Sequence, residues 1–181
     1  MPSNRSQSDT SESAATGRAH GLRNAAFATG LVAAAAVGGS VATDPDGQWY
    51  ARLKKPAWQP PSSAFPVVWT SLYAGIAITS TLVLNELERR GEADAAAEYR
   101  RKLAVNLTLN GLWSWLFFRS HNLGAATAGA AALAASSSGL AKAGGRVRGR
   151  YGLSLLPYAA WTSFATLLAG TIWSLNRRRA S

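Results

Sequence analysis

The chain has 181 residues, 48% of them hydrophobic, and a formal net charge of +10. This length is enough for one domain, and the composition alone suits a soluble globule as well as a membrane bundle. The sequence contains no cysteine, which excludes disulfides, thiolate metal ligands and cysteine catalysis. Lys and Arg gather in short clusters beside apolar segments, and anionic lipid headgroups explain this placement better than a nucleic acid does. We therefore expect membrane lipids as partners and no nucleic acid.

The first twenty residues differ in composition from the rest of the chain. Residues 1–20 are rich in Ser, Thr and Ala and have almost no bulky apolar side chains, which predicts a disordered N-terminal tail. Residues 21–181 contain all the long apolar segments. We predict that they form one membrane domain.

Five segments nearly free of Asp, Glu, Lys and Arg follow the tail. A bilayer core about 30 Å thick takes about 20 residues of helix, so each segment is near the length of one crossing. The predicted spans are about residues 24–43, 62–85, 103–119, 121–141 and 152–175. The sequence thus predicts an all-α polytopic membrane protein, a five-transmembrane-helix bundle.

A soluble all-α protein with Ala-rich core helices is the alternative to this membrane bundle. Residues 65–84 and 153–175 are apolar around the whole helical circumference, which leaves no face for water. The membrane interpretation is therefore favoured.

Aromatic residues recur at helical spacing on three of the predicted spans. The three stripes are Phe65, Trp69, Tyr73 and Ile76; then Asn110, Trp113 and Phe117; then Tyr158, Trp161, Ala165 and Leu168. Such stripes predict aromatic inner faces. Simple packing explains them as well as a ligand pocket does, and Trp49, Trp58 and Trp173 also suit an interfacial aromatic belt.

Four ordered motifs give the chain a specific resemblance. They are WYARLKKPAWQPP from Trp49, FPVVWTSLY from Phe65, LNGLWSWLFF from Leu109 and PYAAWTSFATLLAGTIWSLN from Pro157. The chain from about Asn24 onward resembles the translocator protein family, also called tryptophan-rich sensory protein (TspO/MBR) or peripheral benzodiazepine receptor. The resemblance implies a five-helix, multi-pass homodimer in a bacterial cell membrane. Its ligand would be a porphyrin such as protoporphyrin IX, or haem, with no obligatory cofactor and no metal site.

The resemblance and the stripes together select candidate site residues. The ligand-binding candidates are Trp69, Tyr73, Asn110, Trp113, Phe117, Trp161, Ala165 and Leu168. The lid candidates are Trp49, Arg52, Lys54, Lys55, Pro56, Trp58, Pro60 and Pro61. Trp69 and Trp161 match positions that the family implicates in light-dependent porphyrin breakdown, so they are also the catalytic candidates. The three lid cations would meet ligand propionates, or else lipid phosphates.

Departures from the family pattern narrow the ligand class. The family's Leu–Asn pair in the last span is Leu168–Ala169 here, so one polar pocket contact is absent. The aromatic residue of the family's sterol motif falls on Gly170. We therefore expect porphyrins ahead of sterols.

The span interiors also restrict the function. They contain no Asp, Glu, Lys or Arg, which argues against proton-coupled transport, and no nucleophile–base pair, which argues against a hydrolase. His20 and His121 lie outside the spans. Three functions stay open: a receptor or sensor that binds porphyrins and regulates tetrapyrrole levels, a transporter of tetrapyrroles or other small apolar ligands such as sterols, and a light-dependent porphyrin-degrading enzyme.

Overall fold

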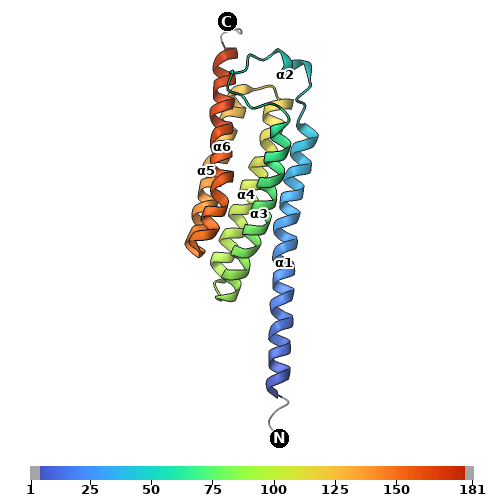
Figure 1. Cartoon of the computed structure of the whole chain (residues 1–181), viewed down its shortest axis with the longest axis vertical. Helices are drawn as coiled ribbons and strands as arrows, with labels where there is room; N and C mark the ends of the chain where they lie inside the picture. The colour runs from blue at the N-terminus through green and yellow to red at the C-terminus, as the bar shows by residue number, and fades with distance from the viewer. Residues whose placement is uncertain (1–4, 178–181) are drawn as a thin grey trace.

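The computed structural model describes the backbone of residues 5–177 and the side chains of residues 17–177. Every element in this range is helical (Figure 1). In chain order these are α1 (Arg5–Ala42), α2 (Gln48–Arg52), α3 (Ala64–Arg89), α4 (Ala93–Ser114), the π-helix η1 (Trp115–Arg119), α5 (Leu123–Val147) and α6 (Gly149–Asn176). The prediction of an all-α helical membrane bundle is confirmed. The predicted tail, residues 1–20, lies largely outside the residues with described side chains and stays a prediction.

The helices differ in how well their length and hydropathy suit a membrane crossing. The stretch of α1 from Gly17, α3 and α6 are each long and apolar enough to cross one. The first half of α4 is charged, and α5 is rich in Ala, Gly and Ser. Large apolar side chains face outward: Val67, Ile78 and Leu153 are 68%, 62% and 67% exposed. Lipid around the bundle gives these side chains an apolar environment.

Two short connections set the pairing of the helices at one end of the bundle. Gly91 has φ +72, and the backbone N–H of Glu92 donates to the carbonyl of Leu87 at 2.9 Å. This left-handed glycine ends α3 and turns the chain directly into α4. At the next connection the extended residue Arg148 alone separates α5 from α6. Short links of this kind make each pair antiparallel.

Helices α5 and α6 approach closely because glycines face one another between them. A Cβ added at Gly152 would lie 2.9 Å from Cα of Gly145 and 3.0 Å from the carbonyl oxygen of Ala141. Small residues at such a crossing let two backbones pack together in a membrane. The pair forms one side of the bundle (Figure 1).

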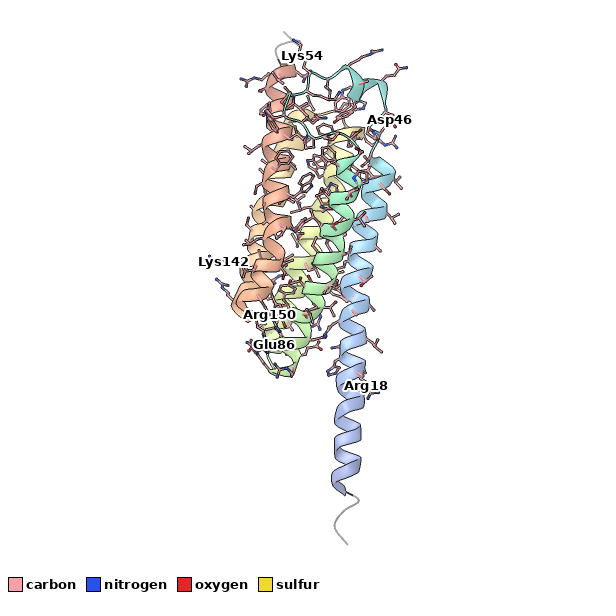
Figure 2. The ribbon with its side chains drawn as sticks, viewed as in Figure 1. Arg18, Asp46, Lys54, Glu86, Lys142 and Arg150 are labelled. Carbon is pink, nitrogen blue, oxygen red and sulfur yellow. The ribbon has the colours of Figure 1, made fainter. Side chains whose placement is uncertain are left out.

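Charged residues concentrate at the end of the bundle where these turns lie. Arg148 Nη2 donates to Glu86 Oε1 at 2.8 Å, and Arg23 Nη2 donates to Glu88 Oε1 at 2.8 Å. Figure 2 shows Glu86 and Arg150 at this end and Lys54 at the other. The ion pairs join α3 to α1 and to the α5–α6 turn, and the loop that contains α2 covers the opposite end.

Candidate ligand-binding site beneath the loop

The loop between α1 and α3 is anchored by aromatic contacts on η1. The ring centroids of Trp49 and Phe117 lie 5.6 Å apart, and those of Tyr50 and Phe118 lie 5.5 Å apart. Trp49 also stacks on His121, with a centroid distance of 4.3 Å. The wide turn of a π-helix changes the angular step between residues, and here two consecutive phenylalanines both contact the loop. Phe117 is buried beneath it.

The second half of the loop is fixed to α6. The backbone N–H of Lys54 donates to Asn176 Oδ1 at 3.0 Å, and Asn176 Nδ2 donates to the carbonyl oxygen of Lys54 at 2.9 Å. Further along, the rings of Trp58 and Phe164 meet edge to face at 5.8 Å. The loop predicted as a lid therefore lies across one end of the bundle, between η1 and α6. The lid role itself stays a prediction.

The three lid cations have different surroundings. Lys55 Nζ donates to the carbonyl oxygen of Tyr50 at 2.6 Å and lies 4.3 Å from the centroid of its ring. Lys54 and Arg52 are exposed, and Arg52 makes a long contact of 3.4 Å with Gln48. Lys55 thus stabilises the fold of the loop, while the other two cations point their charge outward.

The lid prolines Pro56 and Pro60 are half-buried and Pro61 is exposed.

Tyr50 is the centre of the loop's own packing. Gln59 Nε2 donates to the Tyr50 hydroxyl oxygen at 3.2 Å. Burial raises the pKa of Tyr50 above its usual value, and the hydrogen bond from Gln59 offsets part of that rise. The phenol is therefore neutral at physiological pH and acts as a packing and hydrogen-bonding group.

The inner faces of α3 and α6 are lined with aromatic rings, of which Tyr158 is fully buried and the others are half-buried. Trp69 lies 5.4 Å from Tyr73 and 6.4 Å from Tyr158, measured between ring centroids. One turn closer to the loop, Phe65 and Trp161 meet edge to face at 5.8 Å. These distances are typical of favourable aromatic pairs. The two catalytic candidates thus sit in one aromatic lining, Trp69 on α3 and Trp161 on α6.

A chain of hydrogen bonds runs behind this lining. The Tyr73 hydroxyl donates to Asn110 Oδ1 at 2.7 Å, and Asn110 Nδ2 donates to the Tyr158 hydroxyl oxygen at 3.4 Å. The Tyr158 hydroxyl donates to Asn106 Oδ1 at 2.8 Å, and Asn106 Nδ2 donates to Ser137 Oγ at 3.0 Å. Each polar group in this interior has a partner, as burial requires. Asn110 therefore orients the two tyrosines.

The remaining candidates lie nearer the loop. Trp113 stacks on Phe117 at a centroid distance of 5.4 Å, and Trp113 Nε1 donates to the carbonyl oxygen of Ala126 at 3.1 Å. Leu168 is buried in the same cluster, and Ala165 is half-buried one turn after Trp161. The structure thus divides the predicted set into a group around Trp69 and a group around Phe117.

Several residues of this region were absent from the predicted set. They are Tyr158, Asn106, Phe65, Phe164, Tyr50 and Phe118. Tyr158 and Phe65 lie on the predicted stripes, so the helical spacing had already indicated them. Asn106 precedes Asn110 by four residues, and that spacing places both amides on one helical face.

Comparison with known proteins identifies the family. The TspO/MBR family model matches residues 27–174. The chain belongs to the TspO/MBR family. This membership confirms the resemblance drawn from the four motifs, and it makes the chain a multi-pass integral membrane protein. The family match includes α3 to α5 in full, with most of α6 and the part of α1 after Ala26.

Several members of the TspO/MBR family are similar over most of the chain. Protein CrtK of Rhodobacter capsulatus is 34% identical over 155 residues, which cover 83% of this chain and 92% of CrtK. Tryptophan-rich protein TspO of Chlorobaculum tepidum is 33% identical over 152 residues, 83% of this chain and 94% of the relative. The translocator protein of Ovis aries is 32% identical over 134 residues, 74% of this chain and 78% of the relative.

Proposed function

We propose that this TspO/MBR protein is a membrane receptor that binds a porphyrin between α3 and α6, beneath the loop, and regulates tetrapyrrole levels. The observation that supports it is the lining of aromatic rings on the two helices. Trp69 approaches Tyr158 across the helix pair, and Phe65 approaches Trp161. A flat apolar macrocycle needs flat apolar faces, and indole and phenol rings supply them.

The loop supplies charge that suits the same ligand. Protoporphyrin IX has two propionate groups, and Arg52 and Lys54 are exposed cations at the edge of the bundle. Hydrogen bonds between cations and carboxylates are stronger than neutral ones, so these two residues would favour a dianionic ligand. If these two cations face lipid phosphates instead, their removal affects charged and neutral porphyrins equally.

Haem is expected to bind without a strong protein ligand to its iron. Cysteine is absent from the sequence, and the imidazole of His121 stacks on Trp49 outside the α3–α6 lining. Within the described residues no group of three or more His, Asp or Glu side chains is placed to hold a metal ion. A low-spin haem spectrum that disappears in His121→Ala would contradict this expectation.

Titration of the purified protein with protoporphyrin IX in the dark tests the proposal. We expect quenching of indole fluorescence and a shifted Soret band in the wild type, and loss of most of that response in the double variant Trp69→Leu/Trp161→Leu. The matched control is Trp115→Leu, because Trp115 is exposed and lies outside the lining. An equal response from all three proteins would overturn the proposal.

Light-dependent porphyrin breakdown is a second candidate function, because the oxidisable ring of Trp69 lies against the rings of both Tyr73 and Tyr158. The same samples, illuminated in the presence of oxygen, separate the two functions. New absorption bands that require the protein would indicate chemistry, and an unchanged spectrum would indicate binding alone. Uptake of porphyrin into proteoliposomes would instead indicate a transporter.

A further inference from the structure

Two adjoining cavities lie between α4 and α5, near the end of the bundle opposite the loop. One of about 140 Å³ is lined by residues that include Tyr99, Lys102 and Arg146. The other, of about 230 Å³, is lined by Arg101, Lys102, Val105, Ser136 and Gly139. Lys102 lines both cavities, so the two adjoin at this residue, and we treat them together as one groove beside this helix pair. We call it the α4–α5 groove.

The end of the groove nearest the α3–α4 turn has an excess of positive charge. Lys102 pairs with Glu98, and Arg90, which also borders the smaller cavity, is held by Glu86 and lies near Glu92. Arg101 and Arg146 form no ion pair and no side-chain hydrogen bond within the part of the chain that the structure describes. Two guanidinium groups therefore flank Lys102 without an ion pair of their own among the described residues, although both lie near enough to Glu98 to affect its carboxyl group.

The carboxyl group of Glu98 is affected by the same positive charges. Its pKa is lowered, first by the hydrogen bond from Lys102 and also by the charges of Arg101 and Arg146. Glu98 lies five residues before the predicted span 103–119, where that prediction would place the lipid headgroups. A second anion beside these three cations would be stabilised there by the same interactions.

The other end of the groove is apolar and open. Val105 is 52% exposed, and a Cβ added at Gly139 would meet no atom within 4 Å. Ser136 Oγ accepts a hydrogen bond from Asn106 Nδ2 at 3.2 Å, so its polar atom has a partner within the protein. Val105, Ser136 and Gly139 all fall inside the predicted spans. This part of the groove suits a hydrocarbon chain better than water.

We infer that the α4–α5 groove binds one anionic phospholipid, with its phosphate beside Arg101, Lys102 and Arg146 and an acyl chain along Val105, Ser136 and Gly139. Continuity between a cationic end and an apolar groove favours a lipid over a soluble anion, which would need only the cationic end. A second copy of the chain would bring its own cations against these and bury them without compensation. The inference is independent of the porphyrin proposal.

Native mass spectrometry of the full-length chain tests the headgroup part. The purified protein in detergent receives equal amounts of dioleoyl phosphatidylglycerol and dioleoyl phosphatidylcholine, and the retained lipids are counted. We expect the wild type to retain the anionic lipid selectively. In Arg101→Gln/Arg146→Gln that retention should fall about thirtyfold, because each basic residue near an anionic headgroup contributes about a fivefold preference and two such residues are removed.

The matched control removes two cations outside the groove. Arg18→Gln/Lys142→Gln changes the net charge equally, and both side chains are exposed (Figure 2). Lys142 lies one turn before Arg146 on the same helix. This control should retain phosphatidylglycerol as the wild type does. Equal losses in both double variants, or equal retention of the two lipids by the wild type, would overturn the inference.

Gly139→Leu tests the acyl-chain part separately. A Cβ added at Gly139 meets no atom within 4 Å, so the substitution does not press on the backbone and helix content by circular dichroism should be unchanged. Retention of phosphatidylglycerol should fall severalfold, and glycerol phosphate in excess should not displace the lipid from the wild type. Unchanged retention with full displacement by glycerol phosphate would mean a soluble-anion site. A changed oligomeric state in Gly139→Leu would mean an interface between copies. Either result would overturn the lipid inference.

Discussion

The side-chain amide of Asn176 pairs with the backbone of Lys54 in the way that a neighbouring β-strand would. This amide accepts the N–H of Lys54 at 3.0 Å and donates to the carbonyl of the same residue at 2.9 Å. Two residues 122 positions apart are thereby joined, and the loop is held against the last turn of α6. The same amide nitrogen also donates to the carbonyl oxygen of Ile172 at 2.7 Å, which fixes its orientation.

Asn176→Ala should loosen the loop while leaving the helices intact. Loss of two hydrogen bonds worth about 1 kcal/mol each predicts that bound protoporphyrin IX leaves at least about tenfold faster. Stopped-flow fluorescence after dilution measures that rate. Ser174→Ala is the control in the same helical turn, because Ser174 Oγ bonds to the carbonyl oxygen of Thr171 within its own helix and not to the loop. Equal dissociation rates in wild type and Asn176→Ala would show that the loop does not gate the ligand.

Replacement of Trp69 and Trp161 by Phe should preserve folding and alter porphyrin photochemistry. The substitution keeps most of the volume and apolarity of each ring, so the thermal transition should shift little. Indole is the more easily oxidised ring, so any protein-dependent loss of the Soret band in light should slow. Wild-type kinetics in Trp69→Phe/Trp161→Phe would mean that the two tryptophans serve packing alone.

Removal of the two exposed lid cations, Arg52 and Lys54, should discriminate between ligands of different charge. Arg52→Gln/Lys54→Gln should weaken protoporphyrin IX by about 1–3 kcal/mol, because each lost contact is charge-assisted. The neutral dimethyl ester of the same porphyrin should bind almost unchanged. Fluorescence titration with both ligands gives the comparison. Equal losses for both, or none for either, would remove the cations from recognition.

The single variant Lys55→Gln should behave differently from the other two positions. Its ammonium group is already bound to the Tyr50 carbonyl, so its loss disturbs the loop itself. We expect a similar weakening for the acid and for its ester. A selective loss of the acid in Lys55→Gln would mean that Lys55 leaves Tyr50 to meet the ligand.

Tyr158→Phe should destabilise the bundle through the hydrogen-bond chain. The variant leaves Asn106 Oδ1 and Asn110 Nδ2 without the hydroxyl that joins them. Interhelical hydrogen bonds in membranes are worth about 0.6–2 kcal/mol, so the free energy of unfolding should fall by about that amount. Unfolding in a sodium dodecyl sulfate titration measures it. Tyr151→Phe on the same helix is the control, since the Tyr151 hydroxyl has only a 3.5 Å contact with Arg150. Equal destabilisation in both variants would contradict the stabilising role of the hydrogen-bond chain.

The sequence predicted those features that depend on helical spacing. The stripe from Phe65 to Tyr73 does face α6, since Trp69 contacts Tyr158, and the charge-free segment 62–85 lies in α3 apart from its first two residues. Helices continue past the predicted spans into charged sequence: α3 ends at Arg89 and α5 at Val147. Charge limits the part of a helix that lies in lipid and does not end the helix itself.

Contacts between distant segments were not predictable from that spacing. No periodicity relates Lys54 to Asn176, and none indicates that Trp49 stacks on His121. Such pairs depend on where a loop crosses the bundle, which a one-dimensional pattern does not contain. The charge of Lys55 predicts a contact with ligand propionates or lipid phosphates, whereas its surroundings include the Tyr50 carbonyl and ring. The homodimer and the bacterial membrane stay predictions.

The glycine crossing of α5 and α6 sets a limit on how this sequence can vary. At position 152 any side chain begins with a Cβ 2.9 Å from one backbone atom and 3.0 Å from another, and neither belongs to a flexible group that can move aside. At position 149, three residues earlier in the same helix, an added Cβ meets nothing within 4 Å. A library with all twenty amino acids at both sites can be selected for folded protein. It should retain glycine alone at position 152 and many different residues at position 149.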